Sequence, residues 1–157
     1  MTTVHFEPEK IFRARVRQVL GEERKRIHAV LPGVDIQHIG STAIPNSITK
    51  GDLDIQVRVG PRDFEVAYKW LLGFYELNRG NPKTRTFASF KNDSAKVPLG
   101  VQLTVIGGRE DKFVQQRDFL LNNLEYRKKY LSLKRKFEGK SVATYRRAKG
   151  IFFDSLI

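Results

Sequence analysis

The residues best suited to chemistry in this sequence lie between His38 and Arg58. In this segment Gly40-Ser41-Thr42 precedes two carboxylates, Asp52 and Asp54. Glycine lets the backbone approach an anion closely, and hydroxyl groups and the free N–H groups of a turn hydrogen-bond phosphate oxygens. Carboxylates suit Mg²⁺, which neutralises charge during phosphoryl or nucleotidyl transfer. The segment therefore predicts a site for a metal and a phosphate-bearing ligand.

The two carboxylates are expected to point the same way from one strand. Residues 53–59 alternate between apolar and polar types, so a strand with a two-residue period separates them onto two faces. The polar face would carry Asp52, Asp54, Gln56 and Arg58. By itself, Gly-Ser-Thr is often only a turn and Asp-x-Asp is often a solvated strand edge. The order and separation of the two elements favour the functional interpretation.

The elements that must position this segment can be predicted from the remaining pattern. Apolar residues at helical spacing predict a helix over residues 8–31, ended by Pro32-Gly33. We expect further strands at 35–39, 74–77, 86–91 and 97–106, a loop at 78–85, and helices at 61–72, 113–123, 125–137 and 142–156, with a break at Gly139. This order predicts an α+β (mixed α/β) fold: a central mixed sheet of about five strands with helices covering one face, and a helical C-terminal third.

Length and composition favour a single soluble domain. The 157 residues suffice for one hydrophobic core, so residues 1–157 are interpreted as one domain. There are no cysteines, no apolar run near the roughly 20 residues that a membrane helix needs, and no secretory leader at the start. We therefore expect a cytoplasmic protein without disulfides, thiolate metal sites or contact with a membrane.

The chain is strongly basic, with a formal net charge of +12 and a pI near 10.1. A positive field of this strength attracts polyanions, and nucleotides or nucleic acids such as RNA are the natural candidates. The alternative is that basic residues merely keep helix faces soluble. Charge alone does not decide between the two.

Two strings give the chain a family resemblance. His-Ile-Gly-Ser-Thr-Ala-Ile-Pro at 38–45 and Lys-Gly-Asp-Leu-Asp-Ile at 50–55 resemble the GrpB family, within the DNA polymerase beta-like nucleotidyltransferase superfamily. The resemblance runs nearly end to end and continues through residues 84–90, 113–121 and 130–134 and through Tyr145, Lys149 and Phe152. It implies a nucleotidyltransferase-type fold in which Ser41 and its neighbours hold phosphate, and in which Asp52 and Asp54 are catalytic and bind Mg²⁺.

The resemblance also exposes a gap. Active members of the superfamily usually place a third carboxylate on a later strand, as a general base or metal ligand. The corresponding strand here is 101–105, where the polar candidates are Gln102 and Thr104, and neither can act as a base. Asp93 and Asp111 lie in predicted turns. The sequence therefore supports binding more strongly than catalysis.

Several residues have both a functional and a structural interpretation. The expected phosphate- and nucleotide-binding set is His38, Gly40, Ser41, Thr42, Lys50, Arg85, Gln102, Tyr145 and Lys149. His38 could instead brace the turn. Tyr145 and Lys149 share a helix face and could reach one ligand together, or Tyr145 could pack while Lys149 reaches solvent. Arg79, Lys83 and Arg85 could close over phosphates or form a solvated basic loop.

The last third of the chain carries a basic cluster. It comprises Arg127, Lys128, Lys129, Lys134, Arg135 and Lys136, with Tyr126 and Tyr130 interleaved. Such a cluster could follow a nucleic-acid backbone. The aromatic residues lie at helical spacing with Leu133 and Phe137, which favours a packed stripe with a solvated basic face.

Two functions follow from these observations. The first is Mg²⁺-dependent transfer of a nucleotidyl group from a nucleoside triphosphate to an unknown acceptor, which is a small molecule, a protein or RNA. The second is a non-catalytic nucleotide- or RNA-binding module that kept the fold. A scaffold without a ligand site is a third, weaker alternative. The sequence does not indicate the oligomeric state.

Overall fold

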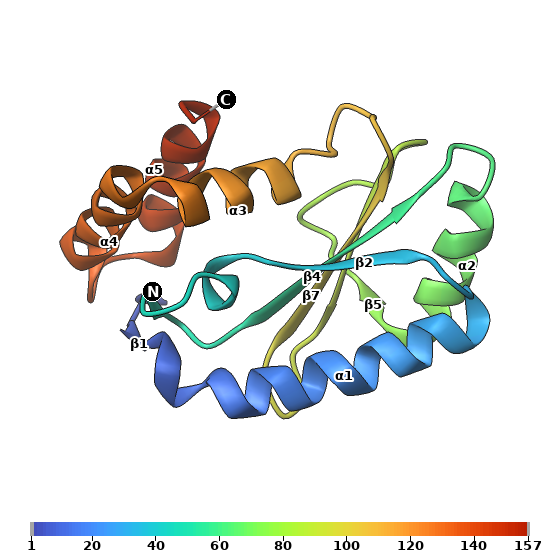
Figure 1. The fold of residues 1–157 in the computed structure, drawn as a ribbon, viewed down its shortest axis with the longest axis horizontal. Coiled ribbons are helices and arrows are strands. Elements are labelled where there is room, and N and C mark those ends of the chain that lie inside the picture. Colours follow the sequence, from blue (N-terminus) through green and yellow to red (C-terminus); the bar gives the residue numbers. More distant parts are fainter. Residues whose placement is uncertain (1, 157) are drawn as a thin grey trace.

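The computed structural model describes residues 2–156 and is built around a five-stranded mixed sheet (Figure 1). The strand order is β2 (Asp35–Ile39), β4 (Leu53–Val59), β7 (Leu99–Val105), β6 (Phe87–Asn92) and β5 (Glu76–Leu77). Strands β4 and β7 are parallel, and the other neighbouring pairs are antiparallel. The α+β fold with a five-stranded mixed sheet is the one that the sequence predicted.

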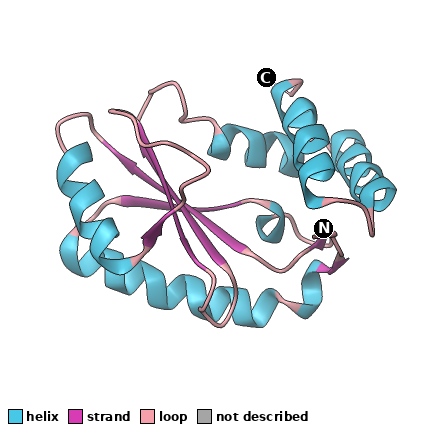
Figure 2. Cartoon of the chain, turned by 180° about the vertical axis from the view of Figure 1, so that it is seen from behind, coloured by secondary structure: helices cyan, strands magenta, loops and turns pink. Residues whose placement is uncertain are grey.

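The helices form two groups (Figures 1 and 2). Helices α1 (Arg13–Val30) and α2 (Phe64–Phe74) pack on the sheet, whereas α3 (Phe113–Asn122), α4 (Leu124–Phe137) and α5 (Val142–Asp154) gather at one end of it. Two short 3₁₀ turns are η1 (Glu9–Ile11) and η2 (Ser41–Ala43). None of the helices within residues 2–156 is long and apolar enough to span a bilayer.

A small two-stranded sheet was not predicted. Strand β1 (Glu7–Pro8) pairs antiparallel with β3 (Ile48–Thr49), so the N-terminal segment lies against the stretch that follows η2. A pair of two-residue strands is too short to show an alternating pattern, which is why the sequence did not reveal it.

The apolar face of the sheet holds the main core. Leu53, Ile55 and Val57 of β4 are fully buried, and they pack with residues from α1 and α2 such as Ile27 and Leu71. The two-residue period that buries these side chains also places the intervening polar side chains on the other face. The alternation in β4 therefore sets both the core and the polar layer.

The polar face carries side chains that are in register across neighbouring strands. Asp54 lies beside Gly100, Gln56 beside Gln102, and Arg58 beside Thr104. Gln56 is fully buried, and its Nε2 donates to Thr104 Oγ1 at 2.9 Å and to Asp111 Oδ1 at 2.8 Å. The loop before α3 thus covers this part of the polar face.

Arg58 joins three segments at the edge of this face. Its Nη1 lies 2.7 Å from Asp35 Oδ2 on β2, and its Nη2 lies 2.7 Å from Asp111 Oδ2 in the loop before α3. Hydrogen bonds from the Arg58 guanidinium lower the pKa of Asp111 to about 2, although burial opposes this shift. Asp111 is therefore a structural partner of Arg58. Of the two carboxylates in predicted turns, Asp93 and Asp111, this one has a role in stabilising the fold.

The first testable prediction concerns unfolding in acid. Because the pKa of Asp111 is depressed from its usual 3.8 to about 2, its ion pair contributes stability that is present above pH 4 and is lost as the pH falls from 4 to 2. Asp111→Asn should lower the free energy of unfolding at pH 7 by roughly 2 kcal/mol, and the gap should close near pH 2. Urea unfolding at several pH values measures this gap. Asp93→Asn, at an exposed turn, is the matched control, and a gap that stays constant down to pH 2 would contradict the assignment.

Candidate functional site

The carboxylate of Asp54 sits between two glycines. A Cβ atom on Gly40 would lie 2.5 Å from Asp54 Oδ2, and a Cβ atom on Gly100 would lie 2.7 Å from Oδ1. Gly40 also has a φ of +77°, a conformation that side-chain-bearing residues rarely adopt. The end of β2 and the start of β7 thus accept no side chain at these positions while Asp54 lies between them.

The electrostatic surroundings of this carboxylate are mixed. Burial raises the pKa of Asp54, the positive charges of Lys149 and Lys50 lower it, and the negative charge of Asp52 raises it. Asp52 is partly exposed, and its Oδ2 lies 3.6 Å from Lys50 Nζ. The site therefore brings two partly exposed carboxylates close to two amines, and a cation bound at the carboxylates would be attracted by their negative charge.

The Gly-Ser-Thr turn is braced by its own hydroxyl groups. Ser41 Oγ lies 2.7 Å from Thr49 Oγ1, and Thr42 Oγ1 donates to the carbonyl of Asp52 at 2.9 Å. These bonds tie the turn to the chain just before β4. Within residues 2–156 the backbone N–H groups of Ser41 and Thr42 make no hydrogen bond, but neither residue lines the two cavities at Asp54, so the structure does not bring these predicted phosphate-binding residues to them.

His38 lies on the opposite face of the sheet from Asp54. It is paired with Ile55 in the β2–β4 register, and its Nε2 lies 2.9 Å from Thr42 Oγ1. Burial, together with the nearby charges of Arg24 and Arg117, lowers the pKa of His38 to about 4, so the ring is neutral at pH 7. The structure does not bring His38 to the carboxylates, and it favours the interpretation of His38 as a brace for the turn.

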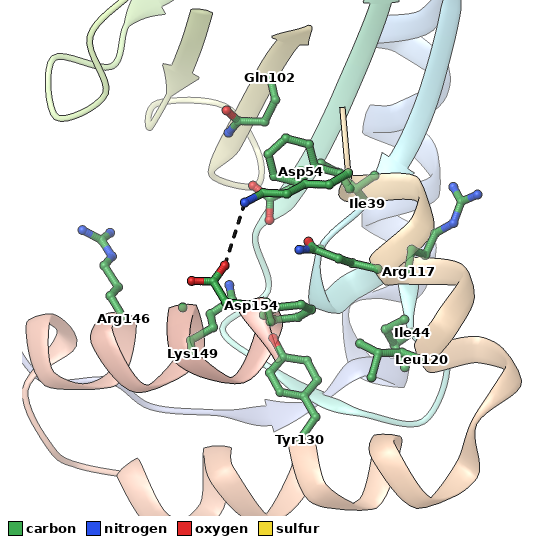
Figure 3. Close-up of a pocket in the computed structure, with 16 residues that line it drawn as sticks. Ile39, Ile44, Asp54, Gln102, Arg117, Leu120, Tyr130, Arg146, Lys149 and Asp154 are labelled. Carbon is green, nitrogen blue, oxygen red and sulfur yellow. Dashed lines mark ion pairs between the residues drawn. The ribbon is translucent and has the colours of Figure 1, made fainter. Parts of the chain in front are cut away.

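Two cavities meet at Asp54. The first has a volume of about 350 Å³ and the second about 650 Å³, and both lie within or near the usual size range of ligand pockets. Residues that line both are Asp54, Gln102, Arg146 and Lys149. Figure 3 shows Asp54 and Gln102 on the sheet side of the first cavity, and Arg146 and Lys149 reaching in from α5. A ligand that occupies both cavities must pass these four side chains.

The cavities differ in their lining. The wall of the first is largely apolar and includes Ile39, Ile44, Phe113, Leu120 and Phe153. The second is mostly polar and includes Asp52, Asn78, Asn81, Lys91 and Asp93. Two residues that line the first cavity form an ion pair, from Lys112 Nζ to Asp154 Oδ1 at 3.9 Å, which is the dashed line in Figure 3.

The predicted pair on α5 separates into two roles. Tyr145 is buried, with its ring centroid 5.1 Å from that of Phe6, whereas Lys149 lines both cavities. Arg85 is exposed in the loop between β5 and β6 and lines neither cavity. In the same loop, Lys83 pairs with Glu65 at 2.9 Å. The predicted site residues that come together at the cavities are thus Asp52, Asp54, Gly40, Gln102 and Lys149, with Lys50 beside Asp52.

The basic cluster on α4 includes one buried member. Lys134 is 1% exposed, its Nζ donates to the carbonyl of Ile48, and it lies 4.2 Å from the centroid of the Tyr130 ring. Burial and the charges of Lys149 and Lys50 hold the pKa of Lys134 well below its usual value. For this cluster the sequence favoured a solvated basic face over a surface for nucleic acid, and Lys134 belongs to neither, because this amine fastens α4 to β3. Tyr130 is likewise buried, in agreement with the packed-stripe interpretation.

Some cavity residues were not identified from the sequence. Arg146 could have been found, because it lies three residues before Lys149 on the same helix. Gln116 and Arg117 lie mid-helix among ordinary polar residues and gave no signal. Asp93 does line the second cavity, at an exposed turn.

The donor set fits a magnesium ion that is bound together with phosphates. Within residues 2–156, no group of three or more histidine, cysteine, aspartate or glutamate side chains is placed to hold a metal ion. Mg²⁺ is commonly held by one or two carboxylates while substrate phosphates and water complete its shell. Asp52 and Asp54 match that pattern, whereas a cage made of protein ligands alone would need more donors.

Comparison with known proteins places these features in a wider group. Residues 12–157 match the family described as GrpB protein. A UPF0157 protein of Vibrio cholerae serotype O1 is 37% identical over 133 residues, which are 83% of this chain and 70% of that protein. The crystal structure of conserved protein GrpB from Enterococcus faecalis has a TM-score of 0.74 at 17% identity, covering 96% of this chain and 93% of that chain.

Larger enzymes share the fold over part of their length. Cid1 poly(U) polymerase with MgGTP bound has a TM-score of 0.55 at 12% identity, covering 80% of this chain and 42% of that chain. A cytoplasmic RNA terminal U-transferase has a TM-score of 0.53 at 15% identity, covering 80% and 39%. At these identities the similarity is one of fold, and the fold is that of nucleotidyltransferases.

The second testable prediction concerns the energetic cost of burying Asp54. Because burial raises its pKa, the ionised carboxylate opposes folding at pH 7, and this penalty falls as the pH drops through the raised pKa toward 3.8. In metal-free buffer, Asp54→Asn should raise the melting temperature at pH 7 by about 2–4 °C, or roughly 1 kcal/mol. The difference should shrink toward pH 4. Asp52→Asn, at a partly exposed position, should change the melting temperature little. Equal shifts in melting temperature in the two variants would contradict this account.

Proposed function

This chain belongs to the GrpB family, and on that premise we propose that it binds a magnesium–nucleoside triphosphate at Asp52 and Asp54 and transfers the nucleotidyl group to an acceptor. The observation that carries the proposal is the meeting of two cavities at the Asp54 carboxylate, with Lys149 lining both. One cavity can take the nucleotide and the other the acceptor, so that both reach the same carboxylate. The MgGTP bound to Cid1 poly(U) polymerase supports the choice of ligand.

Each residue has a defined task in this proposal. Asp52 and Asp54 hold the magnesium ion, which when bound neutralises negative charge on the phosphates. Lys149 and Arg146 attract phosphate oxygens from α5, and Lys50 does so from the chain before β4. Gly40 lets the Asp54 carboxylate lie directly against the backbone that follows β2, because it carries no side chain.

The reaction exchanges one phosphorus–oxygen bond for another. An oxygen of the acceptor attacks the α-phosphorus, the bond from that phosphorus to the bridging oxygen breaks, and pyrophosphate leaves with the bonding electrons. The cations near Asp54 stabilise the charge that collects on the phosphate oxygens. Gln102 lies where a general base would be expected and cannot accept the proton of the acceptor, so an acceptor oxygen that is already ionised suits this site best.

The third testable prediction concerns the proposed ligand. Millimolar Mg²⁺ with a nucleoside triphosphate should raise the melting temperature of the protein, since a ligand that binds only the folded state stabilises it. Asp52→Asn with Asp54→Asn should abolish this shift. Asp63→Asn, an exposed position outside both cavities, should retain it.

The chemistry is tested separately with triphosphates that carry a radiolabelled α-phosphate. In incubations with phosphorylated, hydroxyl-bearing and RNA acceptors, the wild type should transfer the label, with phosphorylated acceptors favoured because their oxygens are already ionised, and Asp52→Asn should transfer none. Transfer that persists in Asp52→Asn would eliminate this mechanism.

A second candidate function is nucleotide or RNA binding without turnover. The observation that favours it is the missing third carboxylate on β7, where Gln102 lies in the register position beside Gln56. The net charge of +12 and the fold shared with an RNA terminal U-transferase agree with an RNA partner. In this case the two carboxylates and the lysines near them bind and position a polyanion, and no pyrophosphate is released.

The fourth testable prediction distinguishes this candidate by its salt dependence. Binding of a fluorescent single-stranded RNA should weaken steeply with salt, with a slope of about −0.7 for each phosphate contact in a plot of log K against log salt. Fluorescence anisotropy in about 50–300 mM KCl measures the slope. A slope near zero would argue against RNA, whereas a steep slope without label transfer would favour the non-catalytic module.

A further inference from the structure

The first cavity combines flat apolar walls with unpartnered polar groups. We infer that it binds the base of the nucleotide and that Gln116 hydrogen-bonds the edge of that base. The inference rests on the proposed function and assigns the base, and the residue that selects it, to this cavity. A planar heterocycle needs apolar surfaces for its faces and a few placed donors and acceptors for its edge.

Gln116 has the required position on α3. It is 9% exposed, it lines the first cavity, and its side-chain amide has no hydrogen-bond partner within residues 2–156. Phe113 and Leu120 lie three residues before it and four after it, so all three share one face of α3, and all three line the cavity. An amide that faces a largely apolar cavity can exchange its bonds to water for bonds to the edge of a base.

Tyr130 supplies a second unpartnered group. It is 3% exposed, it lines the first cavity, and its buried hydroxyl makes no hydrogen bond of good geometry, although the side chain of Tyr145 lies close by. Figure 3 shows the ring rising from α4 with its hydroxyl directed toward the side chains that line the cavity. Burying a hydroxyl without a partner is costly, so Tyr130 is poised to bond a ligand polar group.

The two cavities differ in the polarity of their linings, and this difference indicates which of them takes the base of the nucleotide. The first cavity is apolar enough to hold a base, and the second is lined by side chains such as Asn78, Asn81 and Lys91, which suit a polar acceptor. Asp54 and Lys149 lie where the two meet. With the base in the first cavity, the phosphates reach these residues and the acceptor approaches from the second cavity.

Binding of magnesium complexes of ATP, GTP, CTP, UTP and inorganic tripolyphosphate, measured by isothermal titration calorimetry, tests the inference. The wild type should discriminate at least about fivefold between its best and worst nucleotide, as expected for a hydrogen-bonded edge. Gln116→Leu should bring the four nucleotides within about threefold of one another and leave tripolyphosphate unchanged. Gln116→Glu, which presents only acceptors when ionised, should shift the preference toward guanine, whose edge offers adjacent donors.

Three further variants complete the test, two as controls for a general loss of structure and one that probes the Tyr130 hydroxyl. Gln115→Leu and Gln115→Glu make the same changes at the adjacent exposed position and should reproduce the wild-type ratios. Tyr130→Phe removes only the unpartnered hydroxyl, so it should weaken nucleotide binding several-fold while raising the melting temperature of the free protein.

The outcomes separate this inference from the proposed function. Base ratios that are unchanged in both Gln116 variants, or an equal loss of tripolyphosphate and nucleotide binding, overturn the assignment of the base and leave the metal–phosphate site intact. A wild type that binds all four nucleotides equally also overturns it. A wild type that binds neither nucleotide nor tripolyphosphate overturns the proposed function itself.

Discussion

The close fit of the Asp54 carboxylate between Gly40 and Gly100 is the constraint on which the rest of the site depends. Those glycines come from β2 and β7, the two strands that flank β4, so the carboxylate is positioned only when all three strands are paired. The register that aligns Asp54 with Gly100 also places Gln56 beside Gln102 and Arg58 beside Thr104. A shift of one residue would move these polar side chains into the apolar core. The core and the site therefore depend on the same register.

The polar layer gains its order from hydrogen bonds that link side chains of the sheet to the loop before α3. Gln56, Arg58 and Asp111 form one connected set, which fixes the loop before α3 and hence the start of that helix. Arg117 then joins α3 to β2 through Gln37 Oε1 and the carbonyl of His38, at 2.9 and 3.0 Å. Through these contacts the side of the first cavity that α3 forms is held to the same sheet that carries Asp54.

Much of the fold was accessible from the sequence because it depends on local periodicity. The alternation in residues 53–59 correctly predicted which side chains of β4 lie on the core face, and helical spacing located the helices. The helix predicted from Pro8 begins at Arg13, because residues 7–8 pair as β1 and residues 9–11 form a 3₁₀ turn. The helix predicted from Pro61 begins at Phe64, since the residues before it form a turn. The GrpB resemblance was confirmed by the family match over residues 12–157.

The parts of the site that escaped prediction depend on contacts between distant segments. The face that His38 occupies follows from its pairing with Ile55, and the burial of Lys134 follows from its bond to Ile48, 86 residues away in sequence. Gln116 has no local signal because a glutamine on a helix looks the same whether it faces solvent or a cavity. Residue type alone led to the expectation that the carboxylates bind a metal ion, but only the tertiary arrangement identifies the side chains around them.

Gly100 also limits where a third carboxylate could be placed on β7. An acidic residue at position 100 would put its Cβ atom against Asp54 Oδ1, so no single substitution there can add a carboxylate without displacing the one already present. Position 102, one step further along the same face of β7, has no such overlap with Asp54. On this strand, evolutionary change between a binding module and a catalyst is therefore open at Gln102 and closed at Gly100.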